Sequence, residues 1–196
     1  MRFGRTLQKS IYEPWADYYI DYKALKKLLR ESDASNKESP TRQNDEARKW
    51  TEEDEGAFVE ELVNVQLEKV NKFQVDTYKQ LRDRTSRCES RLETLLTPVE
   101  EKQSNEEQGD ATKHDINGED KQTILKDVLK ELDNITKETT ELEKYSRINF
   151  TGFLKAAKKH DRKRGSNYRV RPLLQVRLAA LPFNSEDYSP LLYQYV

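Results

Sequence analysis

Residues 125–142, LKDVLKELDNITKETTEL, indicate what kind of fold to expect. The less polar side chains of this stretch recur three and four positions apart, at Leu125, Val128, Leu132, Ile135, Thr139 and Leu142. That spacing gathers them into one stripe along a long helix. A second series with helical spacing begins at Phe58 and includes Val65 and Leu95. Each stripe needs an apolar surface to cover it, so we expect the two long helices to pack antiparallel.

The composition agrees with a fold made of long amphipathic helices. Of the 196 residues, 34% are apolar and 36% are charged, and glycine and proline number six each. No long β-branched alternation occurs, and Glu, Lys, Leu and Gln dominate the periodic segments. We therefore expect an all-α fold, in which an N-terminal helical hairpin packs on a bundle built around two long antiparallel helices, with short C-terminal helices.

Local signals divide this single domain, residues 1–196, into segments. Asp21 is a plausible N-cap for a short helix, and Thr51 with Asp54 forms the pattern of a capping box. Asn149 or Thr151 can cap a later, basic helix. The expected segments are a helical hairpin at 1–30, a loop at 31–48, a long helix at 51–96, a disordered acidic linker at 97–122, a second long helix at 123–147, the basic helix at 149–164 and a short helix at 169–181.

The sequence lacks the residues that several classes of function require. Cys88 is the single cysteine, which excludes an intrachain disulfide and has no sequence context for a nucleophile. His114 and His160 lack the neighbours of a metal site, and no phosphate-binding P-loop motif occurs. We expect no catalytic residues, no metal and no cofactor. The chain has neither a signal peptide pattern nor a membrane-spanning apolar run, so we expect a cytoplasmic location, and we expect it to be the N-terminal part of a longer protein.

The net charge of −1 hides a strong segregation of charge along the chain. Residues 1–30 hold seven Lys or Arg against three Asp or Glu, and residues 147–171 hold nine against Asp161 alone. Residues 97–120 carry eight Asp or Glu and two Lys. Two basic segments far apart in the chain thus require an explanation.

The basic residues of the second segment share one helical face. Their spacing is i, i+3, i+4, i+7 and i+8, and they are Lys155, Lys158, Lys159, Arg162 and Lys163. The first segment supplies Lys23, Lys26, Lys27 and Arg30, with Tyr22 one turn before Lys26. The alternative interpretation of each set is a solubilising face, although such faces usually intersperse both signs, and Tyr22 can equally be a core residue. If the hairpin docks on the bundle, however, these side chains converge on one site whose ammonium groups and phenol suit phosphate.

Three separated stretches resemble the SPX domains of eukaryotic phosphate-homeostasis proteins. They are Met1–Leu7 (MRFGRTL), residues 19–27 (YIDYKALKK) and residues 149–161 (NFTGFLKAAKKHD), and the resemblance covers essentially the whole chain. It extends to the vacuolar transporter chaperone group of the family, and it implies that a polyphosphate polymerase is attached beyond residue 196.

The resemblance also implies a ligand and its contacts. SPX domains sense inositol polyphosphates, including inositol hexakisphosphate and inositol pyrophosphates, and bind inorganic phosphate or sulfate weakly. Carried over by motif, Tyr22, Lys26 and Lys159 form a phosphate-binding cluster, and Lys155, Lys158, Arg162, Lys23 and Arg2 form an adjacent surface cluster. Arg2 and Arg162 stand where lysine is common in the family, which retains the charge but changes the donor geometry.

Two functions follow from these observations. The first is a sensor of inositol polyphosphates that signals phosphate status to other domains or subunits at the cytosolic face of the vacuolar membrane. The alternative is a helical protein–protein interaction module with an incidental basic surface. Binding to nucleic acid or anionic lipid is disfavoured by the pI of about 6.2 and by the compactness of the basic patch.

Overall fold

The computed structural model describes residues 3–34, 50–96, 118–164 and 169–193, and every regular element in those ranges is helical. The N-terminal elements are α1 (Phe3–Ser10), the 3-10 helix η1 (Glu13–Tyr18) and α2 (Tyr22–Ala34). They are followed by α3 (Glu52–Glu60), the π-helical segment η2 (Glu61–Leu67), α4 (Glu68–Leu96), α5 (Gly118–Arg164), α6 (Val170–Ala179), α7 (Pro182–Ser185) and α8 (Ser189–Tyr193). The all-α expectation is confirmed.

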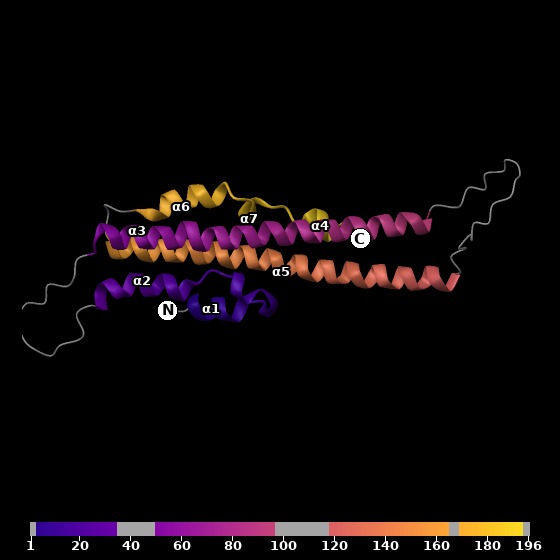
Figure 1. The fold of residues 1–196 in the computed structure, drawn as a ribbon, viewed down its shortest axis with the longest axis horizontal. Helices are drawn as coiled ribbons and strands as arrows, with labels where there is room; N and C mark the ends of the chain where they lie inside the picture. The colour runs from indigo at the N-terminus through magenta and orange to yellow at the C-terminus, as the bar shows by residue number, and fades with distance from the viewer. Residues whose placement is uncertain (1–2, 35–49, 97–117, 165–168, 194–196) are drawn as a thin grey trace, which may run out of the picture. The chain divides into compact units, whose positions relative to one another are not determined.

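The chain divides into two compact units, and α4 and α5 contribute to both. The first unit contains residues 1–78 and 141–188. In it α2 lies beside the C-terminal part of α5, and α6 lies on the opposite side of the α3–α5 pair (Figure 1). The run from α3 into α4 is antiparallel to this part of α5, since Glu55 of α3 lies 2.8 Å from His160, whereas Val70 of α4 accepts a hydrogen bond from the earlier Tyr145.

Tyr145 is the centre of the aromatic core that holds the N-terminal hairpin on the first unit. It is fully buried, and its hydroxyl lies 2.9 Å from the carbonyl oxygen of Tyr18 and 3.3 Å from that of Val70. Trp15 packs edge-on against Phe73 and Tyr145 and thereby joins the hairpin to the bundle. Burial raises the pKa of Tyr145, which therefore stays neutral and keeps its proton for these carbonyls.

The second unit contains residues 79–140 and 189–196. Its segments of α4 and α5 are antiparallel and bury an apolar seam that includes Leu81, Val128 and Ile135. Arg84 bridges two turns of α5, with its Nε 2.7 Å from Glu131 and its Nη1 2.9 Å from Glu138. This unit contains none of the predicted site residues.

The structure corrects three expected boundaries. No break separates 123–147 from 149–164, because α5 is continuous from Gly118 to Arg164. Residues 118–122 are helical rather than part of the acidic linker, and α2 continues to Ala34 rather than ending at residue 30. The rest of the expected loop and linker, 35–48 and 97–117, lies outside the described residues.

Two of the expected inward residues are instead exposed. Val65 has 45% of its surface exposed, whereas its neighbours Gln66 and Leu67 are buried. The reason is η2, because a π-helical turn holds more residues than an α-helical turn and rotates the following side chains around the axis. Leu125, near the beginning of α5, is 43% exposed.

Candidate anion-binding site

The start of α2 is fastened to η2 by Asp21. The side chain of Asp21 caps the helix, since its Oδ1 accepts hydrogen bonds from the backbone N–H groups of Lys23 (3.0 Å) and Ala24 (2.8 Å). Its own N–H donates to Oε1 of Gln66 at 2.7 Å. The predicted N-cap is therefore confirmed, and it determines where Tyr22, Lys23 and Lys26 lie.

The close approach of the hairpin to α5 depends on Gly152 and Asn149. A Cβ atom on Gly152 would lie 2.9 Å from Cγ2 of Ile20. Asn149 is fully buried, accepts from the N–H of Ile20 at 2.8 Å and donates to the carbonyl oxygen of Tyr145 at 2.8 Å. Neither Asn149 nor Thr151 is an N-cap, since both lie inside α5; the buried amide of Asn149 holds the hairpin instead.

Lys159 is the electrostatic centre of the site. Only 9% of its surface is exposed. Its pKa lies below the usual value because of burial first, and then because of the neighbouring cations Arg30, Lys163, Lys26 and Arg162. Within the described part of the chain, no carboxylate forms an ion pair with Lys159, Lys26 or Arg30.

Asp161, the one acidic residue of the basic helix segment, is engaged elsewhere. Its carboxylate accepts from the N–H groups of Val170 at 2.9 Å and Arg171 at 3.2 Å, so it caps the beginning of α6. It also lies 3.1 Å from Nδ1 of His160. The carboxylate of Asp161 therefore forms its hydrogen bonds with α6 and His160 rather than with Lys159.

Tyr22 and Lys26 lie next to each other at the edge of a hollow of about 620 Å³, which α1, η1 and α2 surround. Tyr22 is 4% exposed and packs edge-on against Phe3, and burial raises its pKa. The Nζ of Lys26 is 5.9 Å from the Tyr22 ring centroid. Lys23, Arg5 and Lys69 also line the hollow, together with the acidic residues Asp17 and Asp21.

The other predicted residues fall in three places. Lys158 and Arg162 line a second hollow, of about 460 Å³, at the junction of α5 and α6. Lys155 is exposed on α5 and lines neither hollow. Arg2 lies outside the described residues. The ammonium group of Lys26 thus lies beside the Tyr22 ring, and both Lys26 and Arg162 contribute to the lowered pKa of Lys159.

Four basic residues of the two hollows are not among the predicted site residues: Arg5, Lys69, Arg169 and Arg171. Lys69 reaches the hairpin from α4, where its Nζ donates to the carbonyl oxygen of Asp17 at 3.2 Å. Arg169 and Arg171 line the second hollow from the start of α6. Their inclusion in the basic stretch 147–171 was the available signal for the two arginines, whereas nothing in the sequence distinguishes Lys69.

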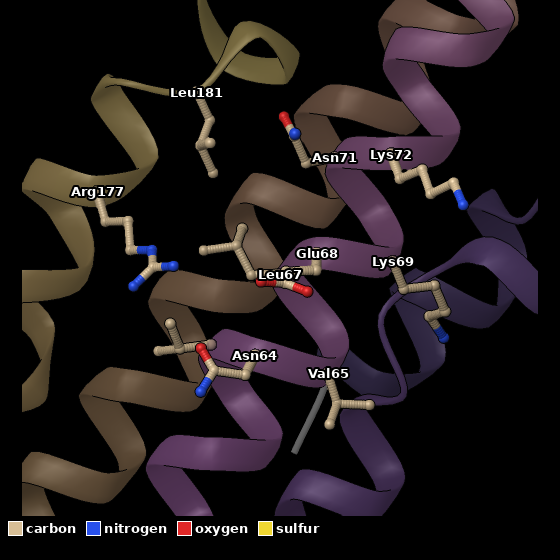
Figure 2. A pocket seen from close by; sticks show the side chains of 10 residues that line it. Asn64, Val65, Leu67, Glu68, Lys69, Asn71, Lys72, Arg177 and Leu181 are labelled. Atoms are coloured by element: carbon tan, nitrogen blue, oxygen red, sulfur yellow. The ribbon is translucent and has the colours of Figure 1, made fainter.

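A further hollow, of about 690 Å³, lies between α6 and the η2–α4 segment. Figure 2 shows Arg177 and Leu181 on the α6 side and Leu67 and Glu68 on the opposite side. Its lining mixes both charges with apolar groups, and none of the predicted site residues belongs to it. This hollow therefore lies apart from the predicted site.

His160 has a structural role beside the site. It is fully buried, stacks on Phe58 and lies 2.8 Å from the carboxylate of Glu55 through its Nε2. Trp50 donates to the same carboxylate at 2.8 Å, which fastens the chain before α3 to α5. In the described ranges no group of three His, Cys, Asp or Glu side chains is placed to hold a metal ion.

No helix in the described segments is both long and apolar enough to cross a membrane.

Comparison with known proteins relates the N-terminal part of the chain to one family model and the fold to a solved structure. Residues 1–57 match the family model of the SPX domain. The chain is 37% identical to the vacuolar transporter chaperone complex subunit 2 of Saccharomyces cerevisiae over 99% of its own length and 20% of that protein. It is 36% identical to the subunit 2 of Schizosaccharomyces pombe over 98% of its own length and 22% of that protein. The chain thus spans about a fifth of the length of these relatives.

A solved structure supports the same conclusion on the fold. The SPX domain of Chaetomium thermophilum glycerophosphodiester phosphodiesterase 1, solved in complex with inositol hexakisphosphate, matches with a TM-score of 0.65. The match covers 97% of this chain and 91% of the other, at 18% sequence identity.

Proposed function

We propose that this chain is an SPX domain that senses inositol polyphosphates and inositol pyrophosphates; the match of residues 1–57 to the SPX family model and the likeness to vacuolar transporter chaperone subunits support this. One observation carries the proposal: Lys159 is almost buried among Arg30, Lys163, Lys26 and Arg162, and the nearest acid on its own helix is bonded to the start of α6. Like charges at this spacing disfavour the folded chain, and an anion with several phosphates removes that cost.

The ligand must carry many charges, because each exposed contact contributes little. A single ammonium–phosphate contact in water is worth about 1 kcal/mol or less, so inorganic phosphate or sulfate binds weakly. A ring with six phosphates collects several such contacts at once. The match to a domain solved with inositol hexakisphosphate supports this choice of ligand class.

The bound ligand joins parts of the chain that are distant in sequence. Tyr22 and Lys26 come from α2, whereas Lys159 comes from α5. Occupancy therefore stabilises the docked hairpin, and this is the change that the rest of the protein or its complex reads. We propose that the reader is a polyphosphate polymerase, attached to this domain or assembled with it at the cytosolic face of the vacuolar membrane. The vacuolar transporter chaperone relatives support that setting.

Calorimetric titration tests the proposal. Inositol hexakisphosphate and inorganic phosphate are titrated into the same domain at two salt concentrations. We expect the hexakisphosphate to bind far more tightly and its affinity to fall with salt, because the attraction is multivalent and Coulombic. Equal affinity for the two ligands contradicts the proposal.

A second candidate function, a helical protein–protein interaction module, has one observation in its favour. Leu125 and Leu129 lie one turn apart on α5 and are 43% and 54% exposed. If recruitment through this surface is the function, Leu125→Ser with Leu129→Ser abolishes the binding of other subunits of the complex, and Lys26→Ala leaves it intact. If the chain is a sensor, Lys26→Ala abolishes the ligand-dependent binding of other subunits, and the two leucine substitutions leave it intact.

A further inference from the structure

The hollow at the junction of α5 and α6 holds more positive charge than the predicted site accounts for. Lys158 and Arg162 line it from α5, and Arg169 and Arg171 line it from the start of α6. Asp161 is the only carboxylate among the residues that line it, and Pro172 and Gln175 complete the wall. Its volume of about 460 Å³ is ample for a phosphate or diphosphate group.

The carboxylate in this hollow already has partners. Asp161 accepts from the N–H groups of Val170 and Arg171 and lies beside His160. Its charge therefore stabilises the beginning of α6. In the described part of the chain, none of the four cations of the hollow forms an ion pair with an Asp or Glu.

Arg162 connects this hollow to the site around Lys159. It lines the hollow, and it is one of the cations that lower the pKa of Lys159. Arg162 therefore adds positive charge both to the surroundings of Lys159 and to the hollow at the start of α6. An anion whose phosphates point in several directions from one ring can occupy both places, whereas a single phosphate cannot.

We propose that the hollow is a second phosphate subsite for the same polyanion, in which Arg169 and Arg171 are specificity-determining residues that favour highly phosphorylated ligands. A guanidinium group binds phosphate through two parallel hydrogen bonds, which a lysine cannot do. The inference rests on the proposed function, and it assigns to α6 a role in ligand recognition beyond the residues of α2 and α5.

The test is the affinity of Arg169→Gln with Arg171→Gln for inositol hexakisphosphate. The matched control is Lys72→Gln with Arg177→Gln, which removes the same charge from exposed positions in the same unit, outside the hollow. We expect the first pair to weaken binding at least fivefold and the control pair less than twofold. Arg169→Lys with Arg171→Lys, which keeps the charge, falls between the two because only the paired hydrogen bonds are lost.

The outcomes separate this inference from the proposed function. Binding by the Gln pair within twofold of the control overturns the second subsite and leaves the sensor function standing. Absence of binding by the unsubstituted domain overturns the sensor function itself. The α6 cap uses backbone N–H groups, so we expect the Gln pair to keep the circular dichroism melting curve of the unsubstituted domain. If the pair unfolds, the single variants are judged by the same comparison, with a twofold loss expected from each.

Discussion

At the scale of the residue, the site is an arrangement of cations that the fold holds together against their repulsion. Lys159 contributes most to this repulsion, because its ammonium group is both desolvated and surrounded by other cations. The nearest acid on its helix, Asp161, is bonded to the start of α6. Such residues lower the stability of the free domain and contribute to ligand binding, so their replacement should raise stability and weaken binding.

Replacement of Lys159 by Met removes the buried charge and keeps the aliphatic packing. We expect the affinity for inositol hexakisphosphate to fall at least tenfold. The folded state should become more stable by about 1 kcal/mol, since several like-charge contacts of a few tenths each disappear. For a domain of this size that is a rise in Tm of roughly 2–4 °C. A lower Tm, or an unchanged binding isotherm, contradicts the role given to Lys159, and exposed Lys126→Met is the control.

The lowered pKa of Lys159 predicts a coupling between ligand binding and protonation. Between the pKa in the folded domain and the usual value of 10.5, the unfolded chain holds more protons, so the stability of the free domain rises with pH across that window. At pH values below this window Lys159 is charged in the folded domain, so the full free-energy cost of its buried charge is present. A bound polyanion favours the charged ammonium and raises its pKa again.

Complex formation should therefore take up protons in the alkaline range just below 10.5, and not from this group near neutral pH. Titration calorimetry in two buffers with different ionisation enthalpies measures that uptake. Lys159→Arg should remove it, because the guanidinium stays charged throughout. Identical binding heats in the two buffers at alkaline pH contradict the assignment.

At the scale of the element, the site depends on how closely the hairpin approaches α5. Ile20 makes this contact from the hairpin: its N–H donates to the buried Asn149 of α5, and its side chain fills the space over Gly152. Two residues later the chain enters α2 with Tyr22. A change at the contact of Ile20 with α5 therefore moves the residues of the site.

Gly152→Ala and Gly56→Ala form a matched pair, since both glycines lie inside helices. Alanine favours a helix over glycine by about 1 kcal/mol, and a Cβ atom on Gly56 meets nothing within 4 Å, so Gly56→Ala should stabilise by about 0.5–1 kcal/mol. At Gly152 the new Cβ comes within 2.9 Å of Cγ2 of Ile20, a branch methyl that cannot swing away. Overpacking of this kind costs about 1–3 kcal/mol and should outweigh the helical gain.

We therefore expect a net loss of stability of about 1 kcal/mol for Gly152→Ala, with weaker ligand binding because Tyr22 and Lys26 are displaced. Chemical denaturation of both variants, with the binding isotherm of each, checks this. Equal stabilisation by the two substitutions contradicts the close contact between Ile20 and α5.

At the scale of the whole molecule, every candidate ligand contact lies in the first unit, residues 1–78 and 141–188. The second unit, through which α4 and α5 continue, contributes none. Ligand that binds the folded state at 100 times its Kd adds about 2.7 kcal/mol to the free energy of unfolding. When only part of the domain opens, the ligand raises the free energy of that opening only if the part contains ligand contacts.

Hydrogen exchange should show this difference within one helix. With inositol hexakisphosphate bound, we expect slower amide exchange in α2 and in residues 150–164 of α5, and unchanged exchange at early times in residues 118–140 of the same helix. An equal slowing along all of α5 shows that the ligand acts on both units and contradicts a site confined to the first.

The helical class, the antiparallel pairing and the identity of most candidate cations can be obtained from the sequence. The physical reason is that these properties are local: a stripe repeats every three or four residues, Asp21 caps the turn that follows it, and Lys155 to Lys163 share a face. The assignment of Tyr22, Lys26 and Lys159 to one ligand stays a prediction of the family resemblance, supported by the charges that the structure gathers around Lys159.

Other properties arise from contacts between residues far apart in the chain. Asn149 is of a residue type that often caps helices, yet it lies inside α5, where its buried side chain accepts a hydrogen bond from the N–H of Ile20 on the hairpin. Val65 fits the apolar stripe, yet the π-helical turn moves it outward. Asp161 resembles a counter-charge for its lysine neighbours until α6 takes its carboxylate. Sequence periodicity contains no information about which distant group satisfies a buried polar atom, so these arrangements exist only once the elements have packed.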